Sequence, residues 1–223
     1  IVPSAILRGG DGAEDLAEIR GALSSAAIGE ADLDAGRWDG ATLLLFLTEW
    51  TAPGTLWLEI GRGELGSVER NGGSYSVSLR GLIATTLATP VAATTSPTCR
   101  ARLGDAACRV DLRRHQRMVA MTGMDGDAIS FAGLPVGIFP FGELRWLEGP
   151  NTGLVQAIVD QEGDRLFLAE ATPYAPIAGT RALLTEGCDK RLATCSGRFA
   201  NVANFRGEPH LPGMDLLTRY PGS

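Results

Sequence analysis

Short apolar segments recur along this chain, and clusters of glycine, proline, asparagine and aspartate separate them. Residues 74–79 have the clearest pattern, because apolar and polar side chains alternate strictly and place Tyr75, Val77 and Leu79 on one face. An Asn-Gly-Gly sequence at residues 71–73 precedes this segment and is a strong signal for a tight turn. The pattern therefore predicts a β-hairpin here, with those three apolar side chains facing a core.

Similar signals repeat in both halves, at the spacing of about 8 to 12 residues that is typical of barrels and sandwiches. In the first half, strands are predicted over residues 41–50, 55–60, 65–70 and 74–79. In the second half, strands are predicted over residues 118–122, 128–131, 143–146, 153–159, 165–168 and 182–185. Residues 15–23 fit either a short helix or a strand, and residues 28–39 are predicted to be a polar turn region. No long segment has a 3.6-residue period, so we expect a mainly β fold: antiparallel barrels or a sandwich with long loops.

A change of composition marks the predicted domain boundary. Residues 88–97 are rich in threonine, alanine and proline, which is typical of a linker or an extended crossing segment. We therefore expect two subdomains joined by this segment: an N-terminal β domain over residues 1–88 and a C-terminal β domain over residues 89–223.

Composition and charge exclude some classes of protein. The longest apolar run, residues 41–47, is far shorter than the roughly 20 residues that a membrane-spanning helix needs. The net charge of −6 argues against general nucleic-acid binding. The sequence begins with Ile1-Val2-Pro3, without an initiator methionine, so the missing basic-then-apolar signal pattern excludes no compartment.

Candidate enzyme motifs are weak in this sequence. Residues 61–66 match G-x-G-x-x-G, but they run into the predicted hairpin and no acidic residue lies between residues 74 and 97. We expect these glycines to permit a turn or a bulge instead. The two histidines, His115 and His210, belong to no recognisable nucleophile motif and are predicted to be ordinary polar residues.

The four cysteines carry the strongest chemical signal. Cys99 and Cys108 form a C-x8-C loop, Cys188 and Cys195 form a C-x6-C loop, and the loops are 79 residues apart. The first loop lies in a basic segment, since residues 99–117 contain six arginines against two aspartates, a net charge of +4.

Three kinds of site remain open on the residues alone. An iron–sulfur cluster held by four thiolates is negatively charged, so basic neighbours and N–H donors would stabilise it. The candidate basic neighbours are Arg100, Arg102, Arg109, Lys190 and Arg191, and the loop glycines Gly104 and Gly187 would let amide groups approach sulfur. Structural zinc usually takes tighter Cys-x2–4-Cys loops. Disulfides or free thiols are the third interpretation, although a chain of 223 residues does not need such bonds to fold.

Several blocks of the chain resemble a known family. They are Gly21–Ser25, Asp34–Ala41, Arg80–Leu82, Pro97–Cys99, Leu103–Asp111, Gly187–Arg191, Thr194–Cys195, Phe199–Asn201 and Asn204–Gly213. These blocks resemble the tail-tip hub proteins of siphophages and of alphaproteobacterial gene transfer agents. The cysteine spacing is also similar to that of the minor tail protein L of phage lambda. The resemblance also implies a further N-terminal segment upstream of residue 1.

The resemblance implies a structural virion protein and not an enzyme. It implies a [4Fe–4S] cluster with Cys99, Cys108, Cys188 and Cys195 as ligands, zinc being the alternative metal. It also implies a ring, for which we expect a homotrimer, at the end of the tail tube. This ring would join a distal tail protein to the receptor-facing proteins, pass DNA through its lumen without specific binding, and assemble in the bacterial cytoplasm.

Two other classes of function are weighed against this one. An iron–sulfur redox protein would need an electron path to a partner, and no second cofactor motif is found in the sequence. A secreted binding module stabilised by zinc or disulfides is the other alternative. Within the hub interpretation, residues 204–213 are predicted to be a packed, non-helical clasp in which Arg206 and Glu208 pair with each other or with a neighbour.

Overall fold

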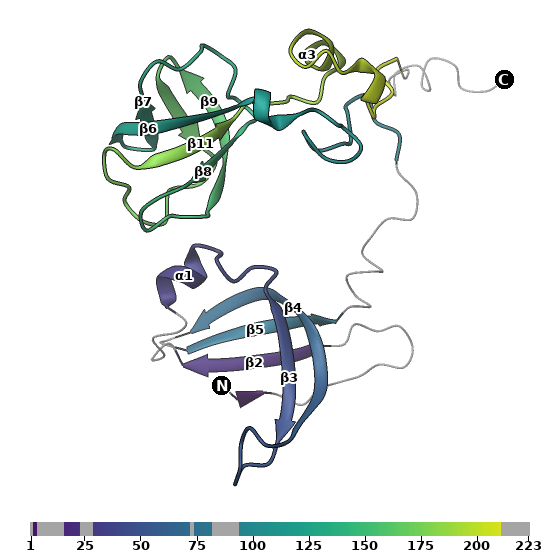
Figure 1. The fold of residues 1–223 in the computed structure, drawn as a ribbon, viewed down its shortest axis with the longest axis vertical. Coiled ribbons are helices and arrows are strands. Elements are labelled where there is room, and N and C mark those ends of the chain that lie inside the picture. Colours follow the sequence, from purple (N-terminus) through teal and green to yellow (C-terminus); the bar gives the residue numbers. More distant parts are fainter. Residues whose placement is uncertain (1, 4–15, 23–28, 72–73, 82–93, 211–223) are drawn as a thin grey trace, which may run out of the picture. The chain divides into compact units, whose positions relative to one another are not determined.

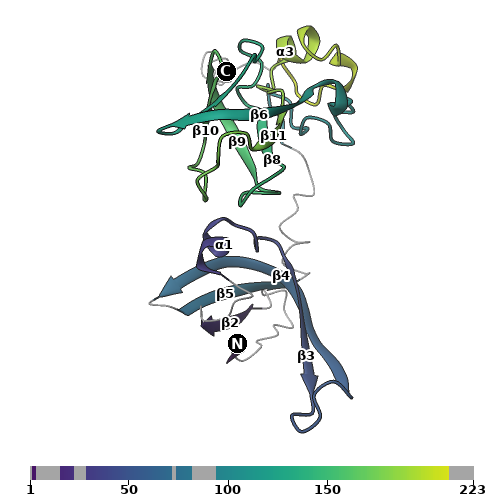
Figure 2. The ribbon, with the colours of Figure 1, turned by 60° about the vertical axis from the view of Figure 1, so that its left-hand side comes forward.

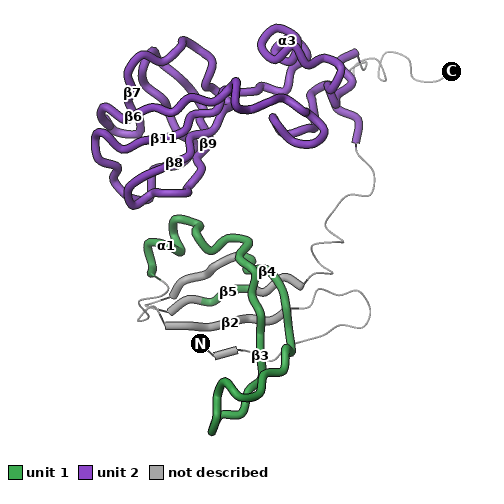
Figure 3. The backbone as a smooth tube through the Cα atoms, in the orientation of Figure 1, with its two compact units in different colours: residues 1–93 green, residues 94–223 purple. Residues whose placement is uncertain are grey.

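The computed structural model describes residues 2–3, 16–22, 29–71, 74–81 and 94–210 of the chain. The chain divides into two compact units, residues 1–93 and residues 94–223 (Figure 3). Both units are built mainly from antiparallel strands (Figure 1), which confirms the expected mainly β fold. No helix within the described ranges is long and apolar enough to cross a lipid bilayer.

The first unit contains a five-stranded antiparallel sheet in the order β1-β2-β5-β4-β3. The strands are β1 (Val2–Pro3), β2 (Leu16–Ala22), β3 (Thr42–Thr48), β4 (Trp57–Asn71) and β5 (Ser74–Gly81). The ambiguous residues 15–23 therefore form a strand. β4 and β5 pair as far as Asn71 and Ser74, which confirms the predicted hairpin.

The small core of this unit lies between the sheet and helix α1 (Glu30–Asp34). Leu33 of α1 and Val77 of β5 are buried, and Trp38 and Leu65 pack against them. Val77 therefore faces the core as predicted. The side chains of Tyr75 and Leu79 lie outside the described part of the structure.

Two predictions for the first unit are wrong. Residues 28–39 are not turns throughout, because α1 forms one helical turn whose acidic residues Glu30 and Asp32 suit the positive end of a helix dipole. Residues 55–60 and 65–70 are not separate strands, because β4 runs through both. The glycine motif of residues 61–66 lies inside β4, and the register shifts there as in a β-bulge, so the predicted bulge is present but the predicted break is not.

The second unit contains a closed six-stranded barrel in the order β10-β7-β6-β11-β8-β9. Its strands are β6 (Gln116–Asp125), β7 (Ala128–Phe131), β8 (Glu143–Trp146), β9 (Val155–Glu162), β10 (Arg165–Leu168) and β11 (Arg181–Thr185). Every strand predicted for the second half coincides with or overlaps one of these strands. The barrel interior holds eleven buried side chains, among them Phe131, Trp146 and Leu166.

Two segments that flank the barrel in sequence form a small lobe beside it (Figures 1 and 2). We call residues 94–115 and 186–210 together the cysteine lobe. Its regular elements are short: η1 (Leu112–Arg114), α3 (Leu192–Gly197) and η2 (Val202–Asn204). β6 and β11 pair antiparallel with Gln116 opposite Thr185, so the first segment ends and the second begins at the same end of the barrel.

Candidate metal centre

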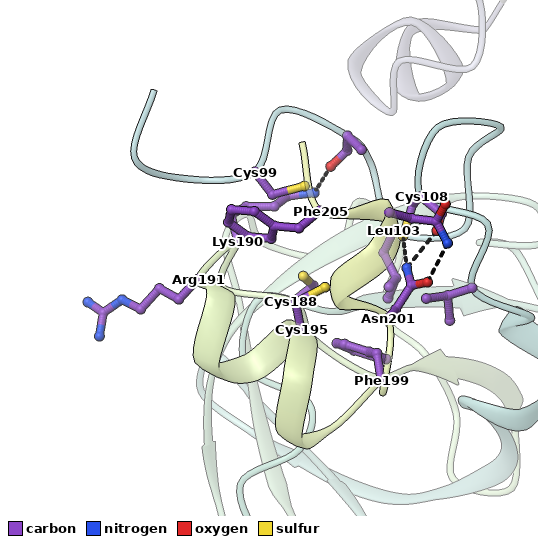
Figure 4. A pocket seen from close by; sticks show the side chains of 13 residues that line it. Cys99, Leu103, Cys108, Cys188, Lys190, Arg191, Cys195, Phe199, Asn201 and Phe205 are labelled. Carbon is purple, nitrogen blue, oxygen red and sulfur yellow. Dashed lines mark hydrogen bonds between the residues drawn. The ribbon is translucent and has the colours of Figure 1, made fainter. Parts of the chain in front are cut away.

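All four cysteines line one small pocket in the cysteine lobe, although their two loops are far apart in sequence (Figure 4). Cys108 and Cys195 are buried, Cys99 and Cys188 are half-buried, and all four are free thiols. The lining is otherwise largely apolar and includes Ala101, Leu103, Val110, Phe199 and Phe205. The structure therefore brings together the four residues that the sequence singled out.

Asp105 shapes the first cysteine loop. Its carboxylate accepts hydrogen bonds from the backbone amides of Arg102 (2.8 Å), Ala107 (2.9 Å) and Cys108 (2.6 Å). These bonds lower the pKa of Asp105, the Cys108 amide having the largest effect. The charged Asp105 carboxylate thus accepts hydrogen bonds from three backbone amides of its own loop and fixes the backbone that carries Cys108.

Close backbone packing positions Cys188 at the start of the second loop. A Cβ atom added to Gly187 would lie only 1.6 Å from the Pro140 carbonyl oxygen, so only glycine fits there. The Gly187 amide donates to the Ile138 carbonyl at 2.8 Å. Arg198 adds to this contact, because its guanidinium donates to the carbonyls of Gly137, Ile138 and Gly187.

Backbone hydrogen bonds join the two segments of the lobe around the pocket. The Cys99 amide donates to the Lys190 carbonyl at 2.8 Å, and the Lys190 ammonium donates to the Ala101 carbonyl at 2.6 Å. Lys190 has a positive φ of 64°, an uncommon conformation for a non-glycine residue. These hydrogen bonds therefore connect the two cysteine loops directly.

Two N–H groups point at sulfur. The Arg206 backbone amide lies 3.3 Å from Cys99 Sγ. The Asn201 side-chain amide donates to the Cys108 carbonyl at 2.6 Å and lies 3.7 Å from Cys108 Sγ (Figure 4). Such donors stabilise metal-bound thiolates. We expected this role for the loops of Gly104 and Gly187, but Gly104 instead leaves room for the Leu112 side chain.

The charged ends of the basic residues lie elsewhere than expected. Arg191 is 79% exposed and points away from the thiols (Figure 4). All five have oxygen partners. Arg100 pairs with Glu208, Arg102 with Glu143 and Arg191 with Asp189, and Arg109 and Lys190 donate to the carbonyls of Ala106 and Ala101. Carboxylates and carbonyls offer these cations closer partners than the thiols do, so their contribution to the pocket is a general positive field.

Burial opposes ionisation of the Cys195 thiol. It raises the pKa of Cys195, and the neighbouring Cys188, Cys99 and Cys108 raise it further because adjacent thiolates would repel one another. A set of four thiolates is therefore unfavourable in this pocket by itself. A bound metal removes the penalty, since a coordinated thiol is deprotonated outright.

A single zinc ion and a four-iron cluster would need different spacings of the four thiolates. Around one zinc ion, Zn–S bonds of about 2.3 Å would hold the thiolates roughly 3.8 Å apart. Among the described residues, no group of three or more His, Cys, Asp or Glu side chains is arranged to hold a single metal ion. A four-iron cluster needs a wider set of thiolates, because each of them binds a different iron atom.

Both histidines lie outside the thiol pocket lining. His115 Nδ1 lies 2.9 Å from a Glu186 carboxylate oxygen, and the imidazole packs edge-on against Phe199 with 4.9 Å between ring centroids. These contacts join the end of the first lobe segment to the start of the second. His115 thus has a structural role that the sequence did not reveal, whereas His210 is exposed.

The prediction for the clasp, residues 204–213, is confirmed in part. Phe205 is half-buried and lines the thiol pocket, and the clasp is non-helical where it is described. Glu208 pairs with Arg100, not with Arg206, through two bonds of 2.6 and 2.8 Å. Residues 211–213 of the clasp lie outside the described residues.

Sequence reasoning missed Asn201, Asp105 and Arg198, which all act on backbone groups. Asp105 had a usable signal, because a short acidic side chain three residues before Cys108 is a typical turn former. Asn201 and Arg198 bind residues 93 and 61 positions away, and no local pattern indicates such contacts.

Comparisons with known proteins agree with this arrangement. Residues 1–111, which include the first cysteine pair, match a family described as baseplate hub protein, N-terminal attachment domain. Residues 137–215, which include the second pair, match a family described as a phage conserved hypothetical protein. No curated protein matches the chain.

A solved structure extends the similarity to the full length. The chain is similar to a chain in the virion of a native gene transfer agent particle, with 37% sequence identity and a TM-score of 0.85. The match covers 100% of this chain and 80% of that one. The chain therefore belongs to the tail-tip, or baseplate, hub proteins of siphophages and gene transfer agents, and it is a structural protein of the virion tail.

Proposed function

We propose that this chain forms a homotrimeric ring at the end of the tail tube. The ring joins a distal tail protein on the tube side to the receptor-facing proteins of the tail tip. Membership of the hub family supports this proposal, and a matching family is described as an attachment domain. The role is structural and needs no catalysis.

The four thiols hold a [4Fe–4S] cluster that serves as a structural cross-link. The observation that carries this proposal is the convergence of Cys99, Cys108, Cys188 and Cys195 on one pocket from the two segments that precede and follow the barrel in sequence. A cluster there joins the segment that enters the barrel to the segment that leaves it. In the reducing cytoplasm where phage-like particles assemble, a metal cluster can make this link whereas a disulfide would be reduced.

The residues around the thiols fit such a cluster. The N–H groups of Arg206 and Asn201 approach two of the four sulfur atoms, and hydrogen bonds to sulfur tune and stabilise iron–sulfur centres.

The ring also passes DNA through its lumen. A chain with a net charge of −6 repels the phosphate backbone, so DNA that enters the lumen is not retained. This part of the proposal predicts no measurable affinity of the protein for double-stranded DNA at physiological salt.

Anaerobic purification followed by metal analysis tests the cluster directly. We expect brown protein with about four irons per chain and a broad visible absorption that disappears on reaction with oxygen or a chelator. Colourless protein that contains one zinc per chain and no iron would overturn the cluster proposal. Cryo-electron microscopy of the tail tip tests the ring separately, by counting copies around the tail axis.

A further inference from the structure

A groove lies beside the thiol pocket, within the second unit. Its volume is about 730 Å³, which is in the range of sites that take small molecules. Residues 102–105 of the first cysteine loop line one side of it. Glu143 and Arg145 of β8 and Leu183 and Thr185 of β11 line the other side. The groove therefore separates the first cysteine loop from the outer face of the barrel.

One of the four cysteines belongs to both cavities. Leu103, Cys188 and Lys190 line the groove as well as the thiol pocket, so they form the wall between the two (Figure 4). The other three cysteines, all of which the structure describes, line the thiol pocket and not the groove. A small molecule in the groove therefore meets the thiol site at Cys188.

The other three thiols are better shielded than Cys188. Cys108 and Cys195 are buried. Cys99 is half-buried, as Cys188 is, but its sulfur accepts a hydrogen bond from the Arg206 amide. Hydrogen bonds to sulfur stabilise metal-bound thiolates, and no described residue donates one to the Cys188 sulfur. Cys188 thus combines exposure with the lack of a stabilising donor.

Contacts that do not involve sulfur hold the two sides of the groove in place. The Asp105 carboxylate fixes the first cysteine loop through backbone amides. β8 and β11 are paired strands of the closed barrel. The ion pair between Arg102 and Glu143, with 2.6 Å between nitrogen and oxygen, joins one side to the other. The groove is therefore a regular part of the fold.

We propose that this groove is the entrance to the thiol site and that Cys188 is its exchangeable ligand, the first of the four to release a bound metal. The inference rests on the metal site proposed above, and it applies to a cluster and to zinc alike. The entering ligand is a small molecule with oxygen or sulfur donor atoms. On release, Cys188 gives up its bond to the metal and takes a proton from water in the groove. The entering ligand takes its place on the metal, and no electron is transferred.

Trapping of the released thiols tests the order of release. The full-length, metal-loaded chain is treated anaerobically with EDTA and iodoacetamide, and the reaction is stopped while most of the metal is still bound. Lysine or arginine residues separate the four cysteines in sequence, so tryptic peptides report each thiol by itself. We expect Cys188 to carry at least about fivefold more label than any other cysteine, because buried thiols react only after local opening. Equal labelling of all four, or more label on Cys99, would overturn the inference.

Filling the groove tests the entrance. Leu183 lines the groove from the outer face of β11, since its neighbours Ala182 and Leu184 are buried in the barrel. Leu183→Trp therefore adds bulk to the groove and changes no residue of the cysteine lobe. Ile177→Trp is the matched control, at a position that is 72% exposed and outside the groove lining.

The rate at which EDTA removes the metal is the measurement for these variants. We expect Leu183→Trp to slow the loss by at least about threefold and Ile177→Trp to keep the wild-type rate. A wild-type rate for Leu183→Trp would overturn the inference. Denaturant unfolding checks that both variants are folded, and the labelling of the wild type needs no variant.

Metal analysis of the starting protein separates this inference from the cluster proposal. Iron-loaded protein in which Cys188 is not labelled first keeps the cluster and refutes the entrance. Zinc-loaded protein in which Cys188 is labelled first refutes the cluster and keeps the entrance. Protein that contains neither metal after anaerobic purification would refute both.

Discussion

The barrel and the cysteine lobe lie in one compact unit, yet different interactions hold them together. The barrel buries eleven side chains in one continuous core and closes all of its strand edges. The lobe buries only four apolar or thiol side chains, Ala101, Cys108, Cys195 and Phe199. Its short segments depend on hydrogen bonds to backbone groups and, in our proposal, on ligation. The barrel should therefore fold by its own hydrophobic core, and the lobe should fold when the cluster binds.

Loss of one ligand should have the largest effect. We expect Cys188→Ser to abolish the visible absorption and the bound iron, because ligation energy in small metal sites is folding energy, of the order of 10 kcal/mol for structural zinc. Hydrogen exchange should then rise sharply in residues 94–115 and 186–210 and remain slow in the barrel strands. Ser196→Ala, at an exposed neighbouring position, is the control and should keep the cluster. Equal protection of the lobe in both variants would contradict a structural role for the cluster.

A substitution in the barrel core should have the opposite effect and destabilise the barrel. Trp146 is fully buried, and its indole N–H donates to Gln156 at 2.9 Å. Trp146→Ala should lower the free energy of unfolding of the barrel by about 3–5 kcal/mol, measured with denaturant. Val136→Ala, at a position that is 83% exposed, should change it little. A barrel that tolerates Trp146→Ala without loss would mean that its core does not stabilise it independently.

Phe205 should have a smaller effect, confined to the lobe. The ring is only half-buried against the thiol pocket, so we expect Phe205→Ala to cost about 2 kcal/mol, less than the 3–5 kcal/mol of a fully buried ring. Release of iron to a chelator should become faster, while barrel unfolding stays unchanged. His210→Ala, at an exposed position five residues away, should leave both properties and particle function as they are. Loss of gene delivery by intact, cluster-loaded His210→Ala particles would show that this segment has more than a structural role.

Substitutions in two surface ion pairs should have the smallest effects on stability. One pair lies in the cysteine lobe and the other on the barrel, so they can be compared directly. Glu208 pairs with Arg100 in the lobe, and Glu148 pairs with Arg181 on the barrel. Arg100 and the Ser96 amide lower the pKa of Glu208 from 4.5 to about 2, and Arg181 lowers the pKa of Glu148. A lowered pKa in the folded state adds stability above pH 4.5, which is lost as the pH falls through the folded pKa.

Glu148→Gln should therefore lower the melting temperature slightly at neutral pH, and the difference from wild type should shrink as the pH falls below 4.5 and vanish below the folded pKa of Glu148. High salt should also reduce the difference in melting temperature between Glu148→Gln and wild type, because salt screens exposed ion pairs. At neutral pH, Glu208→Gln should speed the loss of iron from the cluster. It should leave the melting temperature of the barrel unchanged. A difference for Glu148→Gln that grows in acid would refute the assigned role of the pair.

Local patterns predicted the barrel strands well, and for a physical reason. A strand that faces a closed core needs an apolar residue at every second position, and turns between strands need residues that tolerate unusual backbone angles. Residues 128–131, 143–146 and 165–168 therefore match the observed strands residue for residue. In β4 the same reasoning failed, because a bulge at glycine breaks the local pattern without ending the strand.

The sequence by itself determined the mainly β fold, the four-cysteine set and the family to which the chain belongs. These properties depend on residue type and on spacing along the chain. Only the tertiary structure decided the order of strands in the barrel, the pairing of Arg100 with Glu208 and the approach of the Arg206 amide to Cys99. It also left Leu44, Phe46 and Leu47 of β3 exposed while Leu43 and Leu45 are half-buried. Contacts between residues about 100 positions apart depend on how the whole chain closes on itself, and no local periodicity encodes that closure.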